Sequence, residues 1–231
     1  MRPGPLARQA MMRPMAHPLW PLFDLRLRVD SLELRLPTDD QLIALTDLAK
    51  AGIHPPEEMP FGVAWTRSPS PAFELGFAQY HWSRRAGWRP DDWGLELMVS
   101  LDGVPIGVQA LFARRFAVQR LVHSGSWLGR EWQGRGHGKS MRSAVLALAF
   151  DHLGAEVAES EAFLDNGRSA GVSRSLGYLE NGIGRIAPEG VPRDTQRFRM
   201  TLEAWRSRTR PAVEVEGLEP CLALFEVPTS R

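Results

Sequence analysis

The sequence is poor in cysteine and in long apolar runs. Cys221 is the single cysteine among 231 residues, which excludes a disulfide within the chain and fits a reducing compartment. We interpret it as a tail residue without chemical importance. No apolar run approaches the ~20 residues that a membrane-spanning helix needs. Residues 1–20 mix three arginines with four prolines and lack the apolar centre of a signal peptide. The expected location is the cytoplasm, with no membrane partner.

An excess of one charge is also lacking. The formal net charge is +1, so there is no electrostatic case for a nucleic-acid partner. Ordinary apolar (43%) and charged (24%) fractions indicate a soluble globular protein. We find no internal repeat and no second domain. The sequence therefore predicts a disordered extension over residues 1–20, one domain over residues 21–210, and a tail over residues 211–231 that packs on the body or on a partner.

Hydrophobic periodicity gives the order of the elements. Asp102 and Gly103 predict a hairpin between two of the strands. The fold class is α/β, a single domain with a mixed sheet of six to seven strands flanked by helices. Strands are predicted at residues 32–36, 94–100, 106–112, 118–128, 156–163, from 178 onward, and at 195–202. Helices are predicted at residues 42–49, 72–86, 141–149 and 167–175, with a helical turn at 203–210.

Three alternate glycines stand between a predicted strand and a predicted helix. They are Gly134, Gly136 and Gly138. Glycine lets the backbone turn sharply and approach an anion closely, and a following helix offers unpaired N–H groups and the positive end of its dipole. This pattern is typical of a phosphate-binding loop.

Two common phosphate motifs do not fit these letters. A Walker loop needs a glycine five residues before Gly138, where this chain has Gln133. A dinucleotide fingerprint needs glycine or alanine where this chain has Met141. A P-loop NTPase is therefore disfavoured, and the remaining motif is Gln133-x-x-Gly136-x-Gly138.

This motif resembles the acyl-CoA pyrophosphate motif of the GCN5-related N-acetyltransferases (GNAT). A second segment, residues 164–178, resembles the Asn-x-x-Ser…Leu-Gly-Phe segment of the RimJ/RimL branch, which acetylates ribosomal-protein N-termini; Tyr178 replaces the final Phe. The resemblance covers residues 32–205 in layout, and its specific residues lie within 123–178. It implies a GNAT-like domain whose fourth and fifth strands splay apart, with the pantetheine arm of CoA along the fourth strand.

The resemblance also implies a set of residues that bind acyl-CoA. Backbone N–H groups at residues 134–139 would face the pyrophosphate, the N–H near Leu128 would contact the thioester carbonyl, and Asn166 would bind the pantetheine amides. For Arg135 and Lys139, solvated surface cations are an equal alternative. The full candidate set is Trp127, Leu128, Gln133, Gly134, Arg135, Gly136, His137, Gly138, Lys139, Ser140, Asn166 and Ser169.

Two catalytic candidates depart from the family pattern. RimL-type sequences read Glu-Ile-Gly-Tyr-Trp-Leu where this chain reads His-Ser-Gly-Ser-Trp-Leu, so His123 replaces the glutamate usually proposed as base. An imidazole with a pKa near ~6.5 is a competent base; a histidine hydrogen-bonded in the core is the alternative. Ser173 replaces a tyrosine that protonates the thiolate in many relatives. For this proton transfer three alternatives stay open: Ser173 acts through a water, Ser169 takes its place, or the thiolate leaves without a proton donor. The non-catalytic alternative is that Ser173 is a helix-surface residue.

The resemblance implies an N-acyltransferase that moves an acetyl or succinyl group from acyl-CoA to a primary amine by direct attack, without a metal. The amine belongs to a protein N-terminus, a lysine or a small molecule. Residues 123–128 resemble an actinobacterial subgroup that uses succinyl-CoA, and loss of the glutamate charge at His123 favours an acyl carboxylate. Because the family Glu and Tyr are both missing, a non-catalytic acyl-CoA sensor is the alternative.

Two further expectations concern contacts with partners. Tyr80, Trp82, Trp88 and Trp93 either line the acceptor groove or pack within the helical layer. A homodimer or higher homo-oligomer is expected from family habit and from the apolar residues 218–227, which a lone domain would expose unless they folded back.

Overall fold

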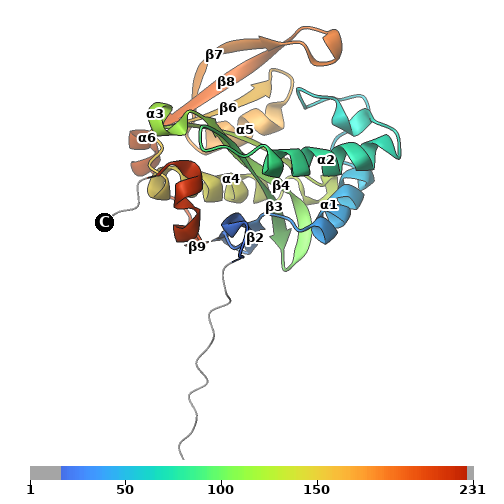
Figure 1. The fold of residues 1–231 in the computed structure, drawn as a ribbon. Helices are drawn as coiled ribbons and strands as arrows, with labels where there is room; N and C mark the ends of the chain where they lie inside the picture. The colour runs from blue at the N-terminus through green and yellow to red at the C-terminus, as the bar shows by residue number, and fades with distance from the viewer. Residues whose placement is uncertain (1–16, 228–231) are drawn as a thin grey trace, which may run out of the picture.

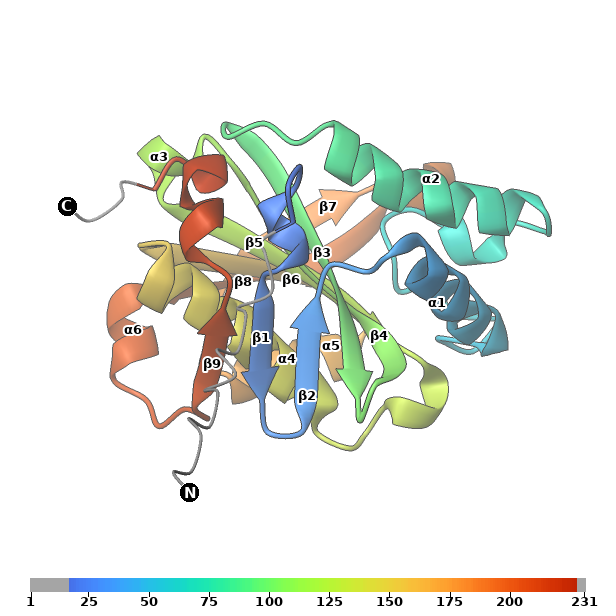
Figure 2. The same cartoon turned by 60° about the horizontal axis from the view of Figure 1, so that its bottom comes forward.

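In the computed structural model, which describes residues 17–227, one nine-stranded sheet runs through the molecule in the order β7-β8-β6-β5-β4-β3-β2-β1-β9. Helices cover both of its faces (Figures 1 and 2). Alternate residues of β3 divide the core between these faces. Leu97 packs in the large cluster that contains Val145 of α4, and Met98 packs with Leu45 of α1 and Phe77 of α2. The predicted α/β class is confirmed.

The first half of the chain builds the antiparallel part of the sheet and the helices on one face. Thr38 caps α1 through a capping box with Gln41, as the turn residues before this helix predict. The elements are β1 (Arg26–Val29), β2 (Leu32–Arg35), α1 (Asp39–Ala51), α2 (Ala72–Ala86), β3 (Asp92–Leu101), β4 (Val104–Arg114), the short α3 (Phe116–Gln119) and β5 (Leu121–Leu128).

The second half supplies the helix on the opposite face and the remaining strands. A π-helical turn at Leu148–His152 continues α4 to the start of β6. The elements are α4 (His137–Ala147), β6 (Val157–Phe163), α5 (Gly167–Ser175), β7 (Leu179–Ile186), β8 (Arg193–Thr201), α6 (Leu202–Arg206) and β9 (Val213–Glu216).

The parallel pair β5–β6 separates partway along its length. The two strands are paired from Leu121↔Val157 to His123↔Glu159 only. Beyond this point β5 stays paired with β4 as far as Leu128, and β6 stays paired with β8 as far as Phe163. The strands therefore splay where the resemblance places the opening, between the strands predicted as fourth and fifth.

The C-terminal segment folds back on its own domain, one of the two predicted alternatives. Strand β9 pairs with β1, and a 3-10 helix at Glu219–Phe225 inserts Cys221 and Phe225 into the core, both 0% exposed. Burial raises the pKa of the Cys221 thiol to about 12, so the thiol is a core group. The sheet has more strands than predicted because β1 and β9, four residues each, were not recognised.

Part of the segment before residue 21 contacts the domain. Residues 1–16 of the expected disordered extension lie outside the described residues. Within residues 17–20, the His17 N–H donates to Asp24 Oδ2 and the Trp20 ring meets Trp88 edge-on at 5.9 Å, whereas Leu19 is 85% exposed.

The four aromatic residues proposed for an acceptor wall have other partners. Trp93 and Trp88 stack at 5.8 Å and both contact Phe225. The Tyr80 hydroxyl donates to Glu96, and the Trp82 indole donates to Asp39. For Trp88 and Trp93 the packing alternative is the correct one, whereas Tyr80 and Trp82 are 50% and 47% exposed. Among residues 17–227, no helix is both long and apolar enough to cross a membrane.

Candidate functional site

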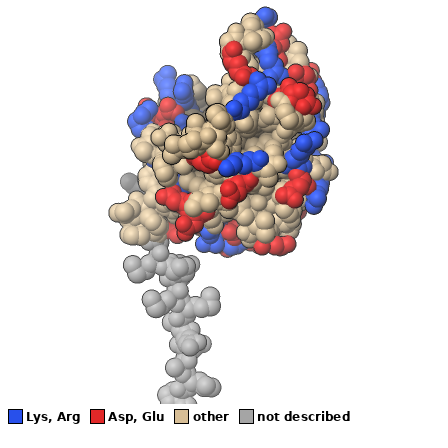
Figure 3. Space-filling view, turned by 90° about the vertical axis from the view of Figure 1, so that its right-hand side faces the viewer, with Lys and Arg blue, Asp and Glu red and all other residues tan. Residues whose placement is uncertain are grey.

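The splay between β5 and β6 opens into a cleft of about 990 Å³. Its walls come from the loop between α1 and α2, from residues 124–142, and from β6 and α5. Figure 3 looks onto the right-hand side of Figure 1, where this loop and the tip of the β7–β8 hairpin lie, and the surface is hollowed there. The volume is within the range of small-molecule and cofactor sites.

One end of the cleft is the predicted phosphate loop. Gly134 and Gly136 have φ values of +74° and +89°, which glycine adopts without strain, and Gly136 caps α4. Within the described chain, the N–H groups of residues 134–138 donate to no backbone carbonyl, whereas Lys139 N–H returns to Gly136 O at 2.9 Å. The loop therefore presents several free donors at the positive end of the α4 dipole.

The predicted side chains of this loop divide into those that line the cleft and those that do not. Lys139 lines it. Arg135 instead lies over the Trp132 ring at 5.4 Å, and the Ser140 hydroxyl donates to Asp30 at 2.6 Å. His137 is also absent from the lining. Nine of the twelve predicted binding residues line the cleft: Trp127, Leu128, Gln133, Gly134, Gly136, Gly138, Lys139, Asn166 and Ser169.

The Gln133 side chain connects three parts of the cleft wall by hydrogen bonds. Its Nε2 donates to Leu128 O at 2.9 Å and to Ile53 O at 2.7 Å, and its Oε1 accepts from Arg168 of α5 at 3.3 Å. One side chain therefore ties the end of β5 to the α1–α2 loop and to α5. Gln133 therefore holds the cleft walls together.

The backbone of β5 offers donors to the cleft. Gly129 N–H donates to Ile106 O in β4, and in an antiparallel ladder such bonds recur at alternate residues. The N–H groups of Ser126 and Leu128 therefore point to the other edge of β5, from which β6 has diverged. A carbonyl oxygen in the cleft would meet these donors.

Helix α5 forms the opposite wall. The Asn166 carbonyl oxygen caps it by accepting from Ser169 N–H at 3.1 Å, which leaves the amide NH₂ as its remaining donor. Asn166 and Ser169 both line the cleft. Asn166 combines the helix-capping role with a position at which it can bind a ligand amide.

Ser173 is fully buried and is not a helix-surface residue, so that alternative is wrong. Its hydroxyl accepts from Arg142 Nη1 at 3.0 Å and lies 3.4 Å from Ser160 Oγ. Arg142, 4% exposed, also donates to Ser160 at 3.1 Å and to Ser126 at 3.4 Å. Arg142 lines the cleft and Ser173 does not.

His123 lies at the last β5–β6 pair, on the sheet face opposite α4. Its side chain is 41% exposed, stacks on Phe112 at 5.5 Å, and has its Nδ1 3.9 Å from Glu159 Oε2. Burial lowers its pKa, and the charges of Glu159 and Glu161 oppose this shift. His123 does not line the cleft, and it is not the hydrogen-bonded core histidine of the alternative interpretation.

The same face carries three carboxylates near the splay. Glu161 lines the cleft and accepts a hydrogen bond from the Thr195 hydroxyl. Glu159 pairs with Arg199 at 2.6 Å. Glu96, 7% exposed, accepts from the Tyr80 hydroxyl at 2.5 Å, and burial raises its pKa. Arg197 lies 3.8 Å from Glu161, so two of these three carboxylates are paired with arginines of β8.

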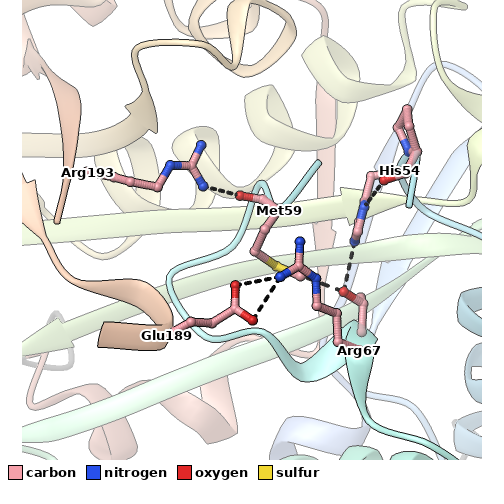
Figure 4. A network of polar contacts seen from close by, with 7 residues as sticks. His54, Met59, Arg67, Glu189 and Arg193 are labelled. Atoms are coloured by element: carbon pink, nitrogen blue, oxygen red, sulfur yellow. Dashed lines mark hydrogen bonds and ion pairs between the residues drawn. The ribbon is translucent and has the colours of Figure 1, made fainter. Parts of the chain in front are cut away.

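Two contacts on this side of the cleft, Arg193 with Met59 and Arg67 with Glu189, connect the α1–α2 loop to the β7–β8 hairpin, and we call them the roof (Figure 4). Arg193 of β8 donates to Met59 O at 2.6 Å, and Arg67 forms two bonds of 2.8 and 2.9 Å with Glu189. Within the α1–α2 loop, His54 Nε2 lies 2.8 Å from Thr66 Oγ1. The contacts of Arg193 and Arg67 join the loop to the β7–β8 hairpin across the gap between the diverging strands.

The sequence model of a family described as the acetyltransferase (GNAT) domain matches residues 31–179. The chain belongs to the GNAT family. Its glycine loop, splayed strands and cleft are thus parts of a GNAT domain.

Solved structures of GNAT proteins share this fold at low identity. RimL, a ribosomal L7/L12 alpha-N-protein acetyltransferase solved with coenzyme A, is 16% identical with a TM-score of 0.62; the match covers 78% of this chain and 99% of RimL. Mycobacterium smegmatis RimJ, solved with CoA-disulfide, is 18% identical with a TM-score of 0.63 over 83% and 97% of the two chains. A Bacillus anthracis GNAT acetyltransferase is 12% identical with a TM-score of 0.58 over 77% and 99%.

Sequence reasoning missed three parts of this GNAT site. Glu161 was detectable from the alternation of β6, which places it on the face of Glu159. Arg142 stands beside the apolar helix positions that begin at Met141, where a charged residue is unusual. The aromatic residues Trp65 and Phe61 approach Trp127 and the cleft from the α1–α2 loop, and no periodic signal marks them because the loop is irregular.

Proposed function

We propose that this GNAT protein is an acyl-CoA-dependent N-acyltransferase, close in kind to RimJ and RimL, that transfers an acyl group to a primary amine by direct attack. The observation that carries the proposal is the glycine loop at the start of α4, which opens into the cleft between the diverging strands. The anionic acyl-CoA donor and the cationic amine acceptor would approach the splay from opposite faces of the sheet and meet there.

The donor is held mainly by backbone groups. The free N–H groups of residues 134–138 and the Lys139 side chain suit the pyrophosphate of CoA. The Asn166 amide suits an amide of the pantetheine arm, and the β5 N–H groups at Leu128 and Ser126 suit the oxyanion that forms when the amine attacks. Acetyl-CoA is the donor that the family supports.

The acceptor amine approaches from the face of Glu161. It binds as an ammonium ion, because the carboxylates of that face attract a cation. It must lose a proton before attack, and His123, at the foot of the splay, is the proposed acceptor of that proton, directly or through water. Its lowered pKa keeps the imidazole neutral at physiological pH.

Protonation of the departing thiolate falls to a group other than Ser173. Ser173 is buried outside the lining of the cleft and its hydroxyl is bound to Arg142. Ser169 lines the cleft near the start of α5, so we assign the proton to the Ser169 hydroxyl or to a water that it binds.

Self-association stays a prediction from family habit alone. The apolar stretch at residues 218–227, which suggested a dimer, packs on the chain's own core through Cys221 and Phe225. A homo-oligomer would therefore need a surface other than this segment, and light scattering at micromolar concentration would test for it.

A panel of acyl-CoA donors and amines, read by mass spectrometry together with release of free thiol, tests the function. Calorimetry with CoA runs alongside. Acyl transfer to at least one amine, with CoA binding, is the expected result. CoA binding without thiol release for any amine, including N-terminal peptides, would favour the acyl-CoA sensor, and absence of CoA binding would exclude both.

A further inference from the structure

Three aromatic side chains gather where the α1–α2 loop meets β5. Trp65 of this loop packs against Phe61 at 5.3 Å and against Trp127 of β5 at 6.0 Å, and we call these three residues the aromatic cluster. Phe61 and Trp127 are half-buried and line the cleft. Apolar surface that faces a cleft is stabilised when an apolar group covers it. The aromatic cluster is therefore a surface on which part of a substrate can pack.

The sheet leaves room beside the aromatic cluster. Gly125 stands two residues before Trp127 in β5, so both residues face the same side of the sheet. A Cβ placed on Gly125 would have one heavy atom within 4 Å outside the adjacent residues, Phe112 Cε1 at 3.9 Å. The partner of Gly125 in β4 is Ala110, another small residue, and Gly125 lines the cleft. A substrate group can therefore approach the backbone of β5 closely at this point.

A carboxylate lies across the splay from this space. The register of β5 and β6, continued beyond its last pair, places Glu161 opposite Gly125 and on the same face of the sheet. The contacts of Glu161 with the Thr195 hydroxyl and with Arg197 are both made by Oε1. Among the residues that the structure describes, Oε2 of Glu161 forms no hydrogen bond or ion pair. Because Glu161 lines the cleft, this second oxygen is available to an ammonium group.

The aromatic cluster is on the acceptor side of the cleft. Trp127 packs with apolar residues of α1 and α2, away from α4, whose N-terminal loop suits the donor. Two residues of a strand rise by about 6.8 Å, and this distance separates the level of Gly125 and Glu161 from that of Trp127. An amine bound at Glu161 therefore needs a group several atoms long to reach the aromatic cluster. A benzyl or isobutyl group is long enough, whereas a hydrogen or a methyl group is too short.

Resting on the proposed function, we infer that the aromatic cluster binds a bulky apolar group joined to the acceptor nitrogen through two carbons. The preferred acceptors are then primary amines that carry an aromatic or long aliphatic group at this position. Oε2 of Glu161 would accept a hydrogen bond from the ammonium ion, and the apolar group would cover Phe61 and Trp127. A free arylalkylamine and the first residue of a peptide present the same chemistry, so the experiment has an arm for each source.

Calorimetry with two bisubstrate conjugates tests the inference without turnover. In each conjugate an acetyl bridge joins the CoA sulfur to the nitrogen of either phenylalaninamide or glycinamide. The wild-type protein should bind the phenylalaninamide conjugate about tenfold more tightly or better, because the benzyl group is buried. Phe61→Ala should reduce this preference to less than about threefold, and Phe61→Leu should keep part of it. Val63→Ala is the matched control, because Val63 is 73% exposed in the same loop and lies outside the lining of the cleft; this variant should keep the preference.

A second variant tests the space beside the aromatic cluster. Gly125→Val fills this space, and because a strand accepts a β-branched residue, the variant should fold even if Phe61→Ala does not. It should weaken binding of the phenylalaninamide conjugate about tenfold or more and weaken the glycinamide conjugate less. An equal loss for both conjugates would contradict the inference.

Turnover identifies the source of the apolar group. Peptides that begin with phenylalanine or glycine form one pair of acceptors, and phenethylamine and ethylamine form the other. A higher kcat/KM for the aromatic member of either pair supports the inference and shows which source the enzyme uses. A preference in neither pair would overturn the inference.

The remaining outcomes separate this inference from the proposed function. Equal binding of both conjugates by the wild-type protein, or a preference that Phe61→Ala retains in full, would overturn the inference alone. A preference of about tenfold for hexanoyl-CoA over acetyl-CoA that Phe61→Ala abolishes would also overturn it, because the aromatic cluster would then bind the acyl chain of the donor. Failure of the wild-type protein to bind CoA would overturn the proposed function.

Discussion

The two faces of the sheet at the splay differ in charge although they are built from the same strands. On the α4 face, β5 and β6 present the hydroxyls of Ser126 and Ser160 around the cation of Arg142. On the opposite face the alternate residues, His123, Glu159 and Glu161, present an imidazole and two carboxylates, and these carboxylates are paired with Arg199 and Arg197 of β8. Because successive side chains of a strand point to opposite faces of the sheet, the same pair of strands can present a surface for anions on one face and a surface for cations on the other.

This separation has a chemical consequence. A thioester of CoA is anionic and an amine acceptor is cationic, and each would bind on the face of complementary charge. Because β5 and β6 separate after His123↔Glu159, the two substrates can meet in the opening between them. The distinction predicts that substitutions on one face change donor binding and substitutions on the other change acceptor binding or proton transfer.

The largest effect is expected at the phosphate loop on the donor side. Gly136→Val places a Cβ on a residue with φ of +89° and distorts the loop, so that donors to the pyrophosphate are lost and CoA affinity falls by more than ~100-fold. Gly103→Val in the β3–β4 hairpin, where φ is +82°, imposes similar strain far from the cleft and is the control. Calorimetry with CoA measures both. Parent-like affinity in Gly136→Val would refute the assignment of the loop.

The next largest effect is expected at His123, the proposed base on the other face of the sheet. His123→Ala should lower turnover ~100-fold and leave CoA affinity nearly unchanged. In the parent, kcat/KM should rise with pH through an apparent pKa below the usual ~6.5 of histidine, because burial lowers the pKa of His123 and the neutral imidazole is the active form. The pH profile of kcat/KM for His123→Ala should lack this rise.

The acceptor amine itself also produces a rising pH profile, so parent and variant must be compared with the same acceptor. His123→Glu, which restores the residue of RimL-type sequences, should recover part of the activity. Unchanged turnover and an identical profile in His123→Ala would reduce the residue to strand packing against Phe112.

A smaller effect is expected from the carboxylate that lines the cleft. Glu161→Gln should raise KM for a cationic amine about tenfold while kcat and CoA affinity change little, since one charge next to the acceptor is lost. Glu180→Gln, an exposed residue of β7 paired with Arg174, is the matched control. Steady-state kinetics at varied amine concentration decides. An equal loss for CoA and amine would contradict the division between the faces.

The sequence was most informative where one short segment carries the function. Gly134, Gly136 and Gly138 identify the phosphate loop because the requirement is local: backbone conformation next to a helix start. The α/β class followed from the order of the predicted elements, and the splay from the family resemblance that this segment and residues 164–178 carry. These features needed no knowledge of long-range contacts, and the fold agrees with them.

The floor of the cleft was not predictable in the same way. Arg142, Ser126, Ser160 and Ser173 come from four separate elements, and each alone is an ordinary polar residue. Their meeting depends on the packing of α4 and α5 against the diverging strands. Ser173 shows the limit clearly: the sequence made it a catalytic candidate, with a helix-surface residue as the alternative, and tertiary packing buried it.

The smallest effect concerns the roof over the acceptor face. Arg67 and Glu189 join the α1–α2 loop to the hairpin, but their side chains are 45% and 40% exposed, so water screens the pair and its contribution to stability is about 0.5 kcal/mol. Arg67→Gln should therefore change the free energy of unfolding by no more than this. KM for the amine should change by less than about threefold, because 0.5 kcal/mol corresponds to about a twofold change.

A double-mutant cycle with Glu189→Gln isolates the interaction from other effects of either substitution. Both variants should bind CoA like the parent, because the roof contacts the donor loop only indirectly. A coupling well above 1 kcal/mol, or a loss of CoA affinity in Arg67→Gln, would show that the roof holds the two halves of the cleft together and that the two faces of the sheet do not act independently. A weak coupling confined to the amine would place the roof on the acceptor side alone.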